Sequence, residues 1–133
     1  MAVSVNTNTN ALNVVLAGSQ GVAGARGDLP QTPVDITCVP SITIDSSQSA
    51  VYRILADQSF TLEAPTNGVD GQRIIIEVQQ DGTGSHPMTV GAGLNAGPVS
   101  VVLSSDPDAI DLLGLMYRES TTEWLIISFA RGY

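Results

Sequence analysis

Lysine is absent from this 133-residue chain, whose net charge is −8 and whose five cationic side chains are all arginine. Proteins that bind nucleic acid or anionic lipid need clustered basic side chains. The composition therefore predicts no nucleic-acid partner and no electrostatic docking on a membrane. The sequence also has no run of 18 apolar residues, so it predicts no membrane-spanning helix.

Cysteine and histidine are nearly absent as well, with one residue of each. A lone cysteine, Cys38, excludes an intrachain disulfide and fits assembly in a reducing compartment such as the bacterial cytoplasm. We expect it to be a buried structural thiol, because a cysteine nucleophile needs a positioned base. His86 lies in a separate glycine-rich turn and is expected to be an exposed loop residue.

The carboxylates do not form a catalytic or metal-binding pattern. Asp106, Asp108 and Asp111 are spaced for turns and caps and lack the glycine and glutamate positions of a calcium loop. Glu63 and Glu77 alternate with apolar residues, which predicts the solvent face of a strand. The sequence therefore predicts no enzyme activity, no cofactor and no metal.

From residue 34 onward, short runs rich in valine, isoleucine and threonine alternate with turn residues. We expect an all-β head domain over residues 34–133, an antiparallel, jelly-roll-like β-sandwich. Residues 81–86 are interpreted as the turn of a hairpin, and Asp106-Pro107 could begin one helical turn. The expected strands cover residues 34–39, 41–45, 50–56, 59–64, 72–80, 87–93, 99–105, 111–119 and 123–131.

Alternation within these strands predicts the core. One face of 72–80 carries Ile74, Ile76 and Val78. Ser120 to Thr122 should close a hairpin between the last two strands, and the C-terminal residues should be tied into the sheet. The candidates for core or subunit contacts in that hairpin are Leu113, Leu115, Trp124, Ile126 and Phe129.

Residues 1–17 combine an Asn/Thr tract with a short apolar run, a composition that cannot build a core alone. We interpret this segment as an anchoring arm that becomes ordered only against a partner. Its candidate contact residues are Val3, Val5, Leu12, Val14, Val15 and Leu16.

Residues 18–33 begin with glycine at every third position, at Gly18, Gly21, Gly24 and Gly27. This is the period of collagen, in which only glycine fits the crowded axis of three chains. Two interpretations stay open: a trimer neck clamped at both ends, or an extended linker. The Arg26-Gly27-Asp28 triplet is interpreted as a by-product of the glycine register.

A series of turn and strand motifs identifies a family resemblance. It runs from Pro65-Thr66-Asn67 and Asp70-Gly71-Gln72 through 80–84 and 89–91 to Gly132-Tyr133. The block from about residue 42 to the end resembles a β-rich module of bacteriophage virion proteins, found in tail-fibre ends, head fibres and capsid-decoration proteins. The resemblance implies a trimeric, non-catalytic module, and short collagen-like triplets recur in such fibres. The chain is short for a long tail fibre.

The sequence and this resemblance together predict a non-enzymatic structural protein of the virion. The first expectation is a homotrimeric capsid-decoration protein, a cement or head-fibre protein held on the major capsid protein or another virion protein by its arm. The alternatives are a short tail-fibre or receptor-binding tip that contacts a host surface glycan, and a stand-alone carbohydrate-binding module. An acidic hydrolase is a further alternative, although the sequence places no acid/base pair for it.

Overall fold

The computed structural model describes residues 29–133. The predicted arm and the four neck glycines therefore lie outside the described residues. The described residues include the whole of the predicted head domain, 34–133, together with the segment that leads into it from Leu29. No helix among these residues is long and apolar enough to span a membrane.

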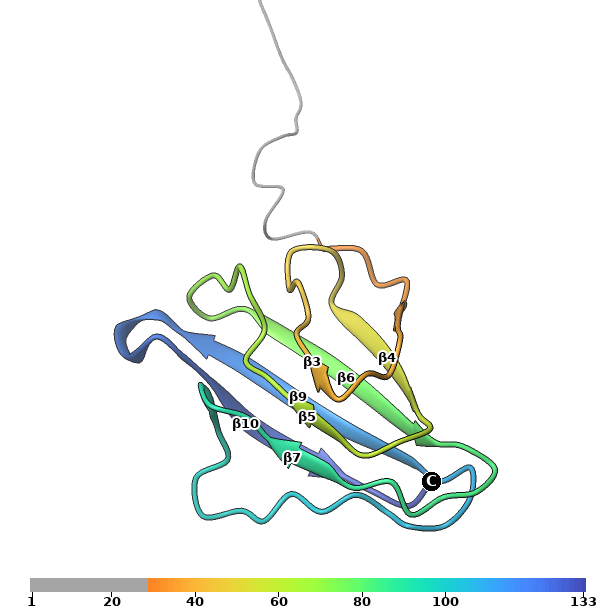
Figure 1. Ribbon diagram of the computed structural model, residues 1–133. Coiled ribbons are helices and arrows are strands. Elements are labelled where there is room, and N and C mark those ends of the chain that lie inside the picture. Colours follow the sequence, from red (N-terminus) through yellow and green to blue (C-terminus); the bar gives the residue numbers. More distant parts are fainter. Residues whose placement is uncertain (1–28) are drawn as a thin grey trace, which may run out of the picture.

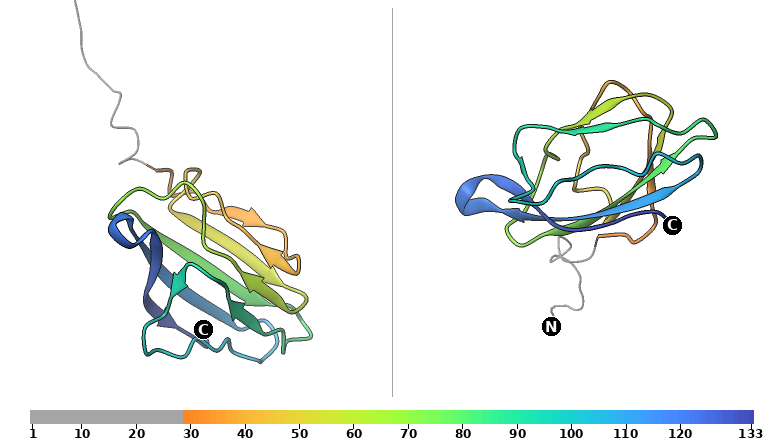
Figure 2. Two further views of the ribbon diagram at one scale, coloured as in Figure 1. Left: turned by 60° about the vertical axis from the view of Figure 1, so that its left-hand side comes forward. Right: turned by 90° about the horizontal axis from the view of Figure 1, so that it is seen from below.

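The described residues form two β-sheets with a single 3-10 turn, η3 (Glu119–Thr121). The sheets face each other across a shared core, as the view from below shows (Figure 2). The three-stranded sheet has the order β3 (Ser41–Ile42), β5 (Phe60–Leu62), β7 (Met88–Val90). The six-stranded sheet has the order β2 (Val34–Ile36), β4 (Val51–Ala56), β6 (Arg73–Gln80), β9 (Ile110–Arg118), β10 (Glu123–Ala130), β8 (Leu94–Asn95).

The first six strands form three stacked coils, each of which gives one strand to each sheet (Figure 1). The coils are β2–β3, β4–β5 and β6–β7, and all neighbours in this stack pair in parallel. In the large sheet Val34 aligns with Tyr52, and Tyr52 with Ile76. In the small sheet Ile42 aligns with Leu62, and Leu62 with Val90. Aligned apolar residues thus stack from coil to coil.

The C-terminal part of the domain closes the large sheet with antiparallel strands. β9 pairs antiparallel with β6, and β10 pairs antiparallel with β9 through the turn at η3, which confirms the predicted terminal hairpin. The chain end is tied to the start of β9, because the amides and carbonyls of Ile110 and Tyr133 bond reciprocally at 3.1–3.2 Å. This confirms the predicted anchoring of the C-terminus.

The all-β class is confirmed, but the antiparallel arrangement predicted throughout the sandwich is wrong for the coils. Residues 81–87 do not close a hairpin: they carry the chain from β6 to the other sheet, where β7 pairs with β5. A hairpin and a corner both need residues with positive φ, here Gly84 and Ser85, so the local sequence cannot distinguish them. Residues 99–105 form no strand, and Asp106-Pro107 enters a turn and not a helix.

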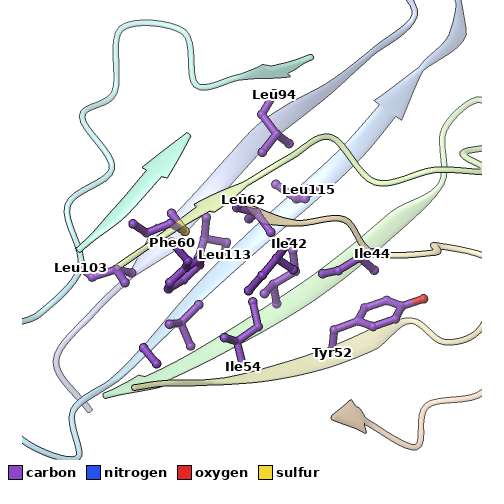
Figure 3. Packing of buried hydrophobic residues seen from close by; sticks show 14 of the residues in the cluster. Ile42, Ile44, Tyr52, Ile54, Phe60, Leu62, Leu94, Leu103, Leu113 and Leu115 are labelled. Carbon is purple, nitrogen blue, oxygen red and sulfur yellow. The ribbon is translucent and has the colours of Figure 1, made fainter. Parts of the chain in front are cut away.

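Alternation along the strands places the apolar side chains between the sheets (Figure 3). Ile74, Ile76 and Val78 are at most 1% exposed, as predicted. Leu113, Leu115 and Trp124 are buried, while Ile126 and Phe129 are partly buried against the same cluster. Trp124 also donates its indole N–H to the carbonyl of Pro65 at 2.9 Å, which fixes the end of the second coil to β10.

Candidate functional site

The outer face of the large sheet is the side that turns away from the core, and it is unusually apolar. In β4, β6 and β9, residues of one parity are buried, so their neighbours in sequence point outward. Leu55 is 55% exposed and Ile75 47% exposed. The apolar members of this outer face are Val51, Leu55, Ile75, Ile110, Leu112, Met116, Leu125 and Ile127.

These residues form one surface because the strands align them in rows. Val51 lies beside Ile75, which lies beside Gly114. A methyl group at Gly114 would collide with the Ser128 hydroxyl oxygen and approach the Ile127 side chain within 3.6 Å. Glycine at this position therefore leaves room for the Ser128 side chain at the bulge between Ile126 and Ser128.

The charged residues on the outer face balance one another. Arg53 pairs with Glu77 at 3.0 Å, and Asp35 aligns with Arg53 in the next strand. The face carries three arginines (Arg53, Arg73 and Arg118) and three carboxylates (Asp35, Glu77 and Glu123), so its charges sum to zero. In a chain of net charge −8, this surface is one on which electrostatic repulsion between copies is small.

A cleft of about 420 Å³ lies at the end of the large sheet where the described chain begins. Its lining includes Leu29, Gln31 and the loop from Val69 to Arg73. The Gln72 side chain accepts a bond from the Val69 amide at 3.0 Å and donates one to the Ser46 carbonyl at 2.7 Å. Asp70 accepts one from the Glu119 amide at 2.9 Å. These hydrogen bonds of Gln72 and Asp70 fix the loop in place. The polar side chains that line the cleft therefore stabilise the fold.

Cys38 is buried, as predicted, and its thiol lies 3.8 Å from the Gln58 carbonyl. Burial raises the pKa of this thiol, which keeps it protonated and unreactive at neutral pH. The interpretation as a structural cysteine is consistent with both observations.

The expectation that His86 is exposed is wrong. Its ring nitrogen Nε2 lies 3.0 Å from Asp81, and its backbone amide and carbonyl both bond to the Gln80 side chain at 2.9 Å. Bonds from the Gly84 and Thr83 amides, with a smaller contribution from His86, lower the pKa of Asp81. His86 is therefore part of the corner that carries the chain from β6 to β7.

The three aspartates interpreted as turn and cap residues have different environments in the structure. Asp111 is 1% exposed and accepts bonds from the Ser104 amide and hydroxyl at 2.6 and 2.8 Å and from the Gly132 amide at 2.9 Å. Asp106 and Asp108 are exposed turn residues. Within residues 29–133, no group of three histidine, cysteine or acidic residues could hold a metal ion.

Sequence reasoning missed both buried polar anchors, Gln80 and Asp111. The signal that could have found them is parity: Asp111 shares the inward parity of Leu113 and Leu115, and Gln80 that of Ile76 and Val78. Glu63 and Glu77 are half-buried at the strand surface, where they bond to Ser41 and Arg53 at 3.0 Å, as expected for the solvent face.

Comparison with known proteins identifies a family for this chain. Residues 37–121 match the family described as "Putative phage tail fibre C-terminal domain", a span that runs from the first coil to η3. The chain belongs to this phage tail fibre family. No curated protein matches the sequence.

Membership in the tail fibre family makes the chain a bacteriophage structural protein and a component of the virion. It also supports the tail-fibre alternative among the expectations from the sequence. The match covers most of the three coils and β9, so the tail fibre domain includes much of the sheet whose outer face is described above.

Proposed function

We propose that this tail fibre domain is a non-catalytic assembly module, in which three copies pack through the outer faces of their large sheets. The observation that carries the proposal is the outer face itself, which is apolar over four neighbouring strands and balanced in charge. Large exposed apolar patches on folded domains mark interaction sites, because isolated hydrophobic side chains on a surface are common but contiguous ones are rare.

A second copy of this chain is the occupant that best fits the outer face. Any partner copy brings the same charge of −8, and the outer face is a surface on which arginines and carboxylates are equal in number. The Asp35–Arg53–Glu77 row crosses the outer face between the Val51–Ile75 row and Leu55, and it offers both signs of charge, which suits self-association. Three copies agree with the glycine triplets at Gly18 to Gly27, whose period suits a three-chain neck.

The family membership supports a proposal for the position on the virion. A tail location is favoured, and the arm at residues 1–17 would then join the module to the rest of the fibre. Capsid decoration through that arm and contact with a host glycan stay predictions. Immunogold labelling of intact virions distinguishes the locations: gold on the tail supports the proposal, and gold distributed over the head supports capsid decoration.

The assembly proposal is tested by measuring the mass of the full chain in solution. Three chains of 13.8 kDa give a particle of about 41 kDa by sedimentation equilibrium. The double substitution Leu55→Glu/Ile75→Glu places two charges on the outer face and should reduce the mass to that of one chain. Val39→Glu is the control, because Val39 is 42% exposed but lies in the connection between β2 and β3 and not in a strand of the large sheet.

Two results would overturn the proposal. A wild-type chain that sediments as a monomer at micromolar concentration excludes self-assembly of useful strength. A trimer that survives Leu55→Glu/Ile75→Glu with an unchanged dissociation constant shows that another surface holds the copies together. Far-UV circular dichroism of each variant verifies that the sheets are intact.

A further inference from the structure

Residues 99–105 connect β8 to β9 along the open side of the domain, between β7 and β10 (Figures 1 and 2). The segment contains no turn and no bend, so the chain runs through it without reversing. It has the composition of a strand, and its sequence predicts one. The structure nevertheless gives it no partner strand within residues 29–133.

The backbone of this segment is largely without hydrogen-bond partners inside the described domain. The amides of residues 100–103 make no hydrogen bond there. Of their carbonyls, that of Leu103 alone is bonded there, by the Arg131 guanidinium at 3.4 Å. Consecutive unpaired amides and carbonyls are a template for another strand.

The side chains of the segment alternate as they do in a half-buried strand. Val101 packs against the core and Leu103 is buried, whereas Ser100 is exposed and Val102 is 57% exposed. The segment is thus held in the domain on one side and open on the other. Val99, at 53% exposed, extends the open apolar side.

We propose that residues 12–16 of this chain, Leu-Asn-Val-Val-Leu, pair with residues 99–103 as an added strand. Both segments have five residues and are rich in β-branched or leucine side chains, which favour strands. Their main-chain groups would satisfy one another, while the arm's apolar side chains cover Val99 and Val102. The pairing requires residues 17–28 to be the extended linker and not a three-chain neck, the two interpretations that the sequence leaves open, so its success would exclude the neck. It does not depend on the assembly of copies through the outer face.

Charge favours the arm over other occupants. Residues 1–17 contain no charged side chain, and neither do residues 87–105, although the chain carries 13 acidic residues. An uncharged strand can therefore approach this segment without the repulsion that most of the surface would cause. The arm is also tethered to the domain, which gives it a high effective concentration at this site.

The connecting chain is long enough for the pairing. Twelve residues, 17–28, separate Leu16 from Leu29, the first described residue, and the extended chain between these two leucines spans about 40 Å. A domain of this size has a diameter of about 33 Å, from its expected radius of gyration. The arm can thus reach residues 99–103 of its own domain or of a neighbouring copy.

Hydrogen–deuterium exchange of the full chain tests the pairing. In the wild type, every second amide of residues 100–103, on the edge that faces the added strand, should exchange at least about tenfold more slowly than in Val14→Pro/Val15→Pro, because proline removes the donors and breaks the added strand. The matched control is Asn8→Pro/Thr9→Pro, which places two prolines in the polar tract of the same arm and should leave the protection unchanged.

Each alternative occupant has its own result, and each overturns the proposal. Amides at 100–103 that exchange at unprotected rates in the wild type show that the arm does not cover them. Protection that persists in Val14→Pro/Val15→Pro and falls on dilution identifies the same segment of a second copy. The variant Leu55→Glu/Ile75→Glu separates the two proposals, because it removes the association through the outer face and leaves the arm sequence intact.

Discussion

The side chain of Gln80 connects the two halves of the third coil, and its substitution is the sharpest test of the fold. Gln80 is the last residue of β6 and is 1% exposed. Its amide nitrogen donates to the His86 carbonyl and its amide oxygen accepts from the His86 N–H, both at 2.9 Å. The Gln80 side chain thereby bonds to both main-chain groups of His86, as a neighbouring strand would, and fixes the corner that leads to β7.

The substitution Gln80→Met keeps the length of the side chain and removes both hydrogen bonds. Two bonds contribute about 1–3 kcal/mol net, and the partly buried His86 groups left without partners add to the loss. Methionine regains part of this through apolar burial. We expect a decrease of about 2–3 kcal/mol in the free energy of unfolding, or a fall in Tm of about 10 °C for a domain of this size.

The adjacent residue supplies the control, since Gln79 is the same residue on the opposite side of β6. Gln79→Met should change the unfolding free energy by less than about 0.5 kcal/mol. Urea unfolding followed by the fluorescence of Trp124, the single tryptophan and 1% exposed, measures both variants at equal chain concentration. Equal losses in the two variants would refute the role assigned to the Gln80 side chain.

Three further predictions concern single sites. Gly114→Ala should destabilise the domain because the new methyl group meets the Ser128 hydroxyl, and Gly114→Ala/Ser128→Gly should recover much of the lost Tm. Hydrogen bonds, first from Asn67, lower the pKa of Asp45 from 3.8 to about 2, so the stability that they contribute is present above pH 4 and lost as the pH falls through 2. Unfolding measured from pH 5 to pH 2 should therefore show a weaker pH dependence in Asp45→Asn than in the wild type. Cys38 should react with a thiol reagent much more slowly in the native protein than in urea, and equal rates would contradict its burial.

Local patterns predicted the strands well because alternation reflects burial directly. The inward parity of Ile74, Ile76 and Val78 was readable from three apolar residues separated by single positions. The hairpin around η3 was equally readable, because its two strands are neighbours in sequence and the turn residues lie between them.

The pairing of the coils was not predictable from the same signals. Val34 and Tyr52 are 18 residues apart, whereas Tyr52 and Ile76 are 24 apart, so the coils leave no fixed period in the sequence. Turn residues such as Gly84 and Ser85 indicate that the chain changes direction but not which sheet it enters next. The hydrophobic periodicity of a strand is also the same for a parallel and an antiparallel partner.

The outer face was missed for a related reason. Leu55, Ile75 and Leu125 stand in three separate strands, and their shared surface appears only when the register between strands is known. In the sequence, each of these residues is a single apolar position between the core positions of its strand. Such a position is readily interpreted as part of the core or as an isolated exposed side chain.

The stack of coils has two different ends, and this makes the domain directional. At one end, antiparallel β9 covers β6 and leaves no strand position in the large sheet for a further parallel coil. At the other end β2 and β3 are edges, and a proline stands just before each of them, Pro33 and Pro40. Proline lacks the amide donor that edge-to-edge pairing requires. The stack is thus protected from end-to-end polymerisation through the parallel strand edges of β2 and β3.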